Sequence, residues 1–263
     1  MLIKEENILK IFKSIYDYFN ENIYDISFYD FNNVYCTDDI NNDVFYFCKP
    51  MQNECIGEME AVTIPENNVS NNPIILIDIT SNDLYSFANA IIHEFIHIYD
   101  YSIFSNMFLN NTYKNITKHK YYYTYKNISE MHAFSICEYH AAKYNDIFFN
   151  VNSTDKFMKD VFLNNFSDIL QKECKKVEQY GCEIYYLMKT FGRIYLLDKY
   201  NNVNDFSNSY VHKFLPMLIH DNIHHNLSYY LYQPMVKFLQ GHRDISEIEY
   251  IQKVIHNLIP VSQ

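Results

Sequence analysis

The sequence of 263 residues has very little glycine, no tryptophan and no long apolar segment. Its four glycines lie far apart, which excludes the glycine-rich loops of dinucleotide-binding folds and P-loop enzymes and the nucleophile elbow of the α/β hydrolases. The strongest apolar run, Pro73 to Ile79, has the length of a strand, whereas a membrane-spanning helix needs roughly 18 apolar residues. We therefore expect neither a nucleotide-binding enzyme of these classes nor a membrane protein.

Positive charge is also scarce, because 21 lysines and arginines face 32 aspartates and glutamates, for a net charge of −11. A nucleic-acid groove needs a basic surface, so nucleic acid is not an expected partner. None of the six cysteines forms a CxxC pair, and the opening residues MLIKEEN lack the layout of a signal peptide. These features predict reduced thiols and a cytoplasmic location.

The first 150 residues combine helical and strand-like patterns. Apolar spacing predicts a helix over 5–19, and a helix-start cluster at 81–83 precedes a second helix that runs to about Phe104. Between them, short β-rich runs separated by Asn, Asp and Pro predict a small sheet. Its expected strands are Val44–Cys48, Glu60–Ile64 and Ile74–Ile79. Residues 128–149 return to helical spacing.

The rest of the chain has helical patterns throughout. The expected helices cover residues 154–179, 182–199, 205–220, 227–240 and 245–258. The fold class is therefore α+β, with a small sheet followed by a mostly α-helical C-terminal half. The change of character near residue 150 is the one boundary that the sequence indicates, between regions 1–150 and 151–263, and both regions can belong to one domain.

A metal-binding motif lies inside the helix that follows residue 83. His93-Glu94-Phe95-Ile96-His97 is an HExxH pattern, and histidines four residues apart project from the same helix face, so that both can reach one cation. Glu94 is offset by about 100°, where a carboxylate can take a proton from water. The alternative is an ordinary solvated helix face, but the helical context and the apolar stripe favour a metal site.

Zinc in a catalytic site takes a third protein ligand, and two glutamates are available for this role. Between His97 and residue 129 there is no glutamate, and the next two are Glu130, in SEMHA, and Glu138, in CEYHA. Because they are eight residues apart, we expect both on nearly one face of one helix, about 12 Å apart along its axis, so that zinc could contact only one of them. Asp100, one turn after His97, is either an acceptor for a ligand histidine or a surface acid.

HEFIH, the preceding strand and the downstream Glu-x-x-Ala helix together resemble the gluzincin metallopeptidases. The resemblance covers about residues 70–150 and is strongest to small intracellular members associated with phages and mobile elements. It implies a minimal catalytic region within 1–150, Zn²⁺ as cofactor and a peptide or protein substrate. It also implies that Glu94 is the general base and that His93, His97 and Glu138 are the ligands, with Glu130 as the alternative.

Two other functions remain open at this point. The chain could be a non-catalytic binding or structural protein of a phage or mobile element that keeps a metallopeptidase-like fold, although a retired site would not need Glu94. It could also be an HExxH hydrolase that attacks another kind of bond, because the motif specifies activated water and not the substrate. A regulatory protein partner is also left open.

One stretch, residues 114–126, combines lysines with tyrosines. Such interleaving can bind single-stranded nucleic acid. Because the stretch joins the two expected ligand helices, we predict instead a loop that forms a cleft wall or lid.

Overall fold

The computed structural model describes residues 5–48, 60–78, 80, 83–180, 183–218, 222–241 and 243–258. Its contacts divide the chain into two units. The first comprises Met1–His119 and Cys137–Thr154, and the second comprises Lys120–Ile136 and Asp155–Gln263. The sequence indicated a single change near residue 150. Residues 120–136 instead belong to the second unit, because helix α4 (Tyr122–Phe134) packs against helix α8 (Glu183–Tyr200).

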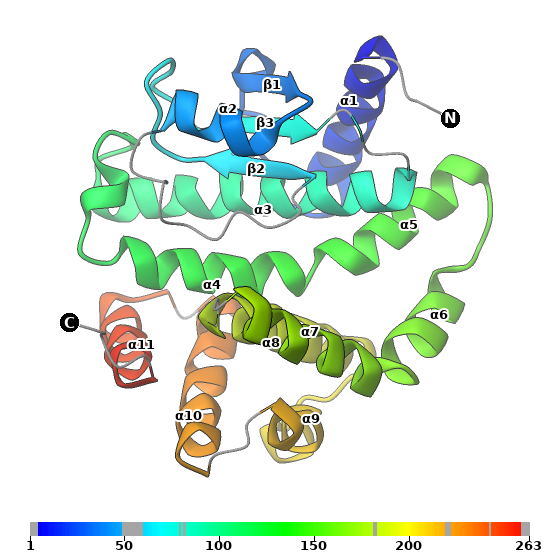
Figure 1. Ribbon diagram of the computed structural model, residues 1–263, viewed down its shortest axis with the longest axis vertical. Coiled ribbons are helices and arrows are strands. Elements are labelled where there is room, and N and C mark those ends of the chain that lie inside the picture. The colour runs from blue at the N-terminus through cyan, green and yellow to red at the C-terminus, as the bar shows by residue number, and fades with distance from the viewer. Residues whose placement is uncertain are drawn as a thin grey trace. The chain divides into compact units, whose positions relative to one another are not determined.

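The first unit contains a three-stranded sheet in the order β1-β3-β2 (Figure 1). Strands β1 (Val34–Thr37) and β3 (Ile74–Asp78) are parallel, whereas β2 (Ala61–Ile64) is antiparallel to β3. The predicted strands at 60–64 and 74–79 are confirmed for the described residues, and so is the α+β class. β1 was not predicted, because four residues carry too short an alternation to be recognised.

The predicted strand Val44–Cys48 is wrong, since these residues lie at the end of helix α2 (Ile40–Phe47). Asp39 caps this helix by accepting a hydrogen bond from the Asn42 backbone N–H at 3.2 Å. The helical spacing of Ile40, Val44 and Phe47 places all three side chains in one cluster with the sheet. A short apolar run is ambiguous between strand and helix, and the cap decides for helix here.

Side chains alternate between the two faces of the sheet. Tyr35, Val62 and Leu76 are in register with one another and face α2, with which they form one apolar cluster. Thr63 is one residue further along β2 and faces the opposite way, where its hydroxyl donates to the Glu94 carbonyl oxygen at 3.3 Å. The sheet therefore lies between α2 on one face and the helix that carries the HExxH motif on the other.

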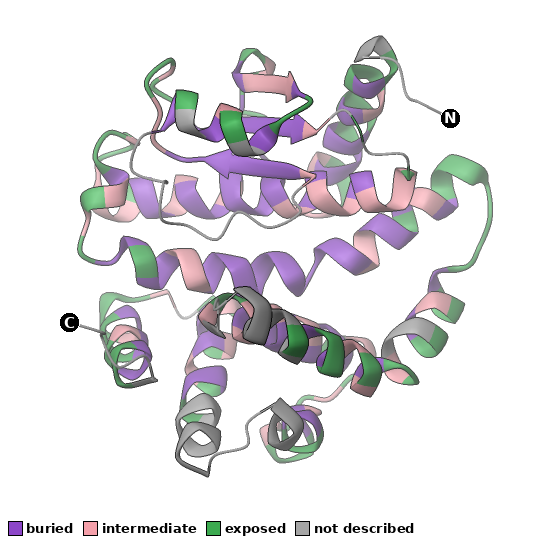
Figure 2. Cartoon of the chain, in the orientation of Figure 1, coloured by how far each residue is buried: buried purple, intermediate pink, exposed green. Residues whose placement is uncertain are grey.

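That helix, α3 (Leu84–Phe108), is the central element of the first unit. It starts where the sequence predicts, because the Asp83 carboxylate accepts the Ser86 N–H at 2.8 Å. It packs against β2, α5 (Cys137–Phe149) and α1 (Glu5–Asn22), which the sequence placed at 5–19. Phe95 makes edge contacts with Phe12 and Phe19 of α1 at 5.2 and 5.3 Å between ring centroids. Much of α3 is consequently buried (Figure 2).

The single helix predicted over 128–149 is wrong, since α4 ends at Phe134 and α5 begins at Cys137. The Ser135 hydroxyl donates to the His132 carbonyl at 2.7 Å, and the Ile136 N–H bonds to the Ala133 carbonyl three residues back. The local side-chain bond and the tighter turn end the helix. Glu130 and Glu138 therefore lie on different helices, and the expectation that both occupy one helix face fails.

The regular secondary structure described in the second unit is all helical, as the sequence predicts for this half. Besides α4 and α8 it contains α7 (Phe166–Tyr180), α9 (Val211–Leu218), α10 (Asn222–Leu239) and α11 (Ile245–Leu258). Before α7 lie the short helix α6 (Thr154–Phe157) and a π-helical segment (Met158–Leu163). A 3₁₀ turn occupies Phe206–Asn208 in this unit, and two others occupy Phe31–Asn33 and Ile116–Lys118 in the first unit. Among the described residues no helix has the length and apolar character required to cross a bilayer.

Candidate metal centre

The two histidines of the HExxH motif converge on one point. The Nε2 atoms of His93 and His97 lie 3.0 Å apart, and their rings meet edge to face with 4.7 Å between centroids. Two nitrogens that bind one tetrahedral zinc at 2.0–2.1 Å are separated by about 3.3 Å. The histidine pair is therefore close to the spacing that a shared cation requires, with Nε2 as the donor atom of each ring.

Neighbouring side chains hold this part of α3 in place. Tyr101, one turn after His97, stacks on the His97 imidazole with 5.9 Å between ring centroids and 24° between ring planes. The Thr63 hydroxyl of β2 fixes the Glu94 carbonyl from the other direction. Sequence reasoning missed both residues. The i+4 spacing of Tyr101 after His97 is a signal that could have identified it, whereas Thr63 depends on a contact between distant segments.

Two polar residues of the motif and the nearby Asp100 are buried, whereas His93 is half-buried. Glu94 is 6% exposed, His97 is 5% exposed, and Asp100 is 3% exposed. The pKa of the Tyr29 phenol is raised, mainly by burial and in smaller part by nearby negative groups that include Glu94. Acidic residues are rarely this buried, which fits a functional acid at this position.

A third donor completes a group suited to metal binding. One ligand atom each of His93, His97 and Glu130 lie within 4.8 Å of one another. Two imidazoles and one carboxylate form the donor set of a catalytic zinc site, which keeps its fourth position for water or substrate. This group could hold a metal ion, and its composition is the one that the sequence predicted, with the alternative glutamate as its third member.

Glu138, the favoured third ligand, is not a member of this group. It is buried at the start of α5, which packs against α3 within the first unit. Two residues later, His140 shares a hydrogen bond of 3.0 Å between its Nδ1 and the Tyr18 hydroxyl of α1. The geometry therefore gives Glu138 no support as a ligand, and the role of Asp100 beside a ligand histidine stays a prediction.

The lysine- and tyrosine-rich stretch is not one loop. Residues 122–126 are the beginning of α4, and the buried Tyr125 ring contacts Phe238 of α10 at 5.8 Å. Glu66 holds the preceding turn by accepting the Asn115 N–H at 3.1 Å and the Thr117 hydroxyl at 2.6 Å. The predicted loop is therefore wrong for residues 122–126, which belong to a helix of the second unit that buries Tyr122 and Tyr125. The role of the stretch as a cleft wall or lid stays a prediction.

The comparisons with known proteins add no relative. No protein-family model, curated protein or solved structure matches the chain. The resemblance to gluzincins consequently rests on the HEFIH motif, the preceding strand and the downstream Glu-x-x-Ala pattern.

Proposed function

We propose that the chain is a zinc-dependent peptidase in which His93, His97 and Glu130 hold the metal and Glu94 is the general base. The observation that carries the proposal is the group of three donors, with the two imidazole nitrogens 3.0 Å apart on successive turns of α3. Three protein donors, rather than four, are typical of a catalytic zinc site. Glu94 directly follows the first ligand histidine, as the base does in HExxH hydrolases.

Zinc bound by this group would activate a water molecule and polarise the bond to be hydrolysed. The side chains of the protein would transfer the proton and orient the metal ligands. Glu94 accepts a proton from the attacking water and delivers it to the leaving nitrogen. The buried surroundings of Glu94 and His97 strengthen these interactions by excluding bulk water. Tyr101 keeps the His97 ring in its ligating orientation by stacking on it.

The sheet favours a peptide as substrate. In the described part of the chain β2 pairs with β3 alone, and its Thr63 contacts α3 at Glu94. An extended peptide can add to the edge of such a strand through main-chain hydrogen bonds. A substrate bound in this way would run past the motif helix next to its general base.

The test separates hydrolysis from metal binding. Glu94→Gln keeps the size of the side chain and removes the base, so we expect zinc content to stay unchanged. Hydrolysis of a denatured protein substrate, followed by mass spectrometry, should fall about 10²-fold or more. Glu21→Gln, an exposed glutamate of α1, is the matched control.

If Glu94→Gln retained full hydrolysis, Glu94 would not be the base. If the wild-type protein bound zinc and cleaved neither peptides nor proteins, the chain would instead be a binding protein with a metallopeptidase-like site. We also propose a cytoplasmic location, which the absence of a CxxC pair from the sequence supports.

A further inference from the structure

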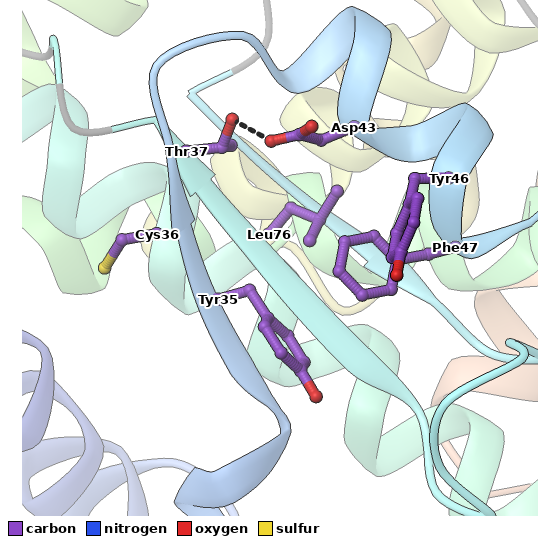
Figure 3. A pocket seen from close by; sticks show the side chains of 7 residues that line it. All are labelled: Tyr35, Cys36, Thr37, Asp43, Tyr46, Phe47 and Leu76. Carbon is purple, nitrogen blue, oxygen red and sulfur yellow. Dashed lines mark hydrogen bonds between the residues drawn. The ribbon is translucent and has the colours of Figure 1, made fainter.

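We infer that the outer face of the sheet carries a binding site for a lysine or arginine side chain of a partner polypeptide. The site is a hollow of about 300 Å³ between β1 and α2 in the first unit (Figure 3). Seven residues line it: Tyr35, Cys36, Thr37, Asp43, Tyr46, Phe47 and Leu76. It lies on the face opposite α3, so it is separate from the metal centre.

Aromatic rings form much of the wall of the hollow. Phe47 is buried and lies between two tyrosines, with centroid distances of 4.9 Å to Tyr35 and 5.2 Å to Tyr46. Tyr46 is 73% exposed, which is unusual for so large an aromatic residue that has an apolar cluster beneath it. Leu76 contributes an aliphatic surface between the rings and the Asp43 end (Figure 3). The faces of aromatic rings attract cations.

The carboxylate of Asp43 lines the same hollow as these aromatic rings. The Thr37 hydroxyl donates to Oδ2 of Asp43, and among the described residues no side chain donates to Oδ1. No lysine, arginine or histidine lines the hollow among the residues that the structure describes. The negative charge of Asp43 is therefore available to a ligand, and the surrounding chain, with its net charge of −11, does not oppose a basic partner.

The carboxylate and the aromatic rings together favour a lysine or arginine side chain as the ligand. A metal ion would require several oxygen donors, whereas the hollow offers one carboxylate oxygen beside aromatic and aliphatic surface. The methylenes of lysine or arginine can cover Leu76 and the tyrosine rings while the charged head reaches Asp43. A neutral or acidic side chain would leave the carboxylate without a counter-charge.

The experiment uses ¹⁹F NMR of the full-length protein labelled with 3-fluorotyrosine, whose Tyr35 and Tyr46 signals are assigned from Tyr→Phe variants. The probe is a capped Gly/Ser peptide with one central arginine, compared with the same peptide carrying citrulline, which is uncharged but of similar shape. We expect the arginine peptide to shift both signals with a Kd of roughly 1–10 mM, as a single side chain should bind. The citrulline peptide should shift neither.

Variants locate the binding within the hollow. Asp43→Asn, which hardly changes the volume, should weaken the arginine peptide about five-fold or more, and Tyr46→Ala about three-fold or more. Tyr123→Ala removes a tyrosine that is 67% exposed outside the hollow and should leave the affinity unchanged. His93→Ala should also leave it unchanged. Equal shifts with the citrulline peptide, or an Asp43→Asn variant that binds as well as wild type, would overturn the inference.

Discussion

Gly192 controls how closely α8 approaches α4, the helix that carries Glu130. A Cβ atom added at Gly192 would lie 2.5 Å from the Met131 carbonyl oxygen and 2.6 Å from the Phe134 Cβ. Normal contacts of this kind are about 3.4 Å or longer, so the helices would have to separate by most of an ångström. We therefore expect Gly192→Ala to move the residue next to Glu130 and to weaken zinc binding.

The size of the effect follows from two opposing contributions. Alanine improves helix propensity by about 1 kcal/mol over glycine. Overpacking against a backbone that cannot yield costs about 3 kcal/mol. The net loss of about 2 kcal/mol should lower the melting temperature by roughly 4–8 °C for a protein of this size. Differential scanning calorimetry measures this change, and a competition titration with a chelator measures the zinc affinity.

Gly241→Ala is the control for this prediction. Gly241 has a φ of 104° and no atom within 4 Å of an added Cβ, so alanine there strains the backbone without a clash. It should cost about 1 kcal/mol and leave the zinc affinity unchanged. A Gly192→Ala protein as stable as wild type, with the same zinc affinity, would refute the packing argument.

Three further changes test individual contacts. Burial opposes ionisation of Asp146, but hydrogen bonds from Ser153 and Thr154 outweigh it and lower the carboxyl pKa to about 2. The stability that this acid supplies is therefore present above pH 4 and is lost as the pH falls from about 4 to 2. Acid unfolding of Asp146→Ala, followed by circular dichroism, should show a weaker pH dependence in this range and about 2 kcal/mol less stability at pH 7. Asp198→Ala leaves the buried Ser209 and Tyr232 hydroxyls without their acceptor, so the free energy of unfolding measured in urea should fall by about 2–4 kcal/mol. Asp198→Asn keeps an acceptor oxygen and should retain most of the stability. Tyr101→Leu keeps the bulk but removes the ring beside His97, and it should weaken zinc about 10-fold in the chelator competition.

The helix that carries the HExxH motif could be predicted from the sequence almost completely. Asp83 caps α3 as its residue type predicts, and the spacing of His93 and His97 brings their Nε2 atoms together. These features are local, since an α-helix fixes the relation between residues three or four positions apart. Local patterns also predicted β2, β3 and the helical second half.

The prediction of one helix over 128–149 failed because contacts between distant residues and a single side chain determine the structure there. No glycine or proline marks the end of α4. At the break Ser135 bonds to the His132 carbonyl, and the last turn of α4 lies against Gly192, some 60 residues later. Without that break Glu130 and Glu138 seemed to be alternatives on one face. The choice between them depended on a weak Glu-x-x-Ala pattern that occurs twice. The sequence could therefore narrow the proposed third ligand to two residues, of which Glu130 belongs to the group of possible donors in the structure.

The most direct test of the account is the metal content of three proteins purified without chelator and measured by inductively coupled plasma mass spectrometry. Wild type should contain about one zinc per chain, Glu138→Ala should retain it, and Glu130→Ala should lose most of it, because two histidines alone hold zinc poorly. Wild-type protein without zinc, or a Glu130→Ala variant that keeps the metal while Glu138→Ala loses it, would contradict the proposed centre.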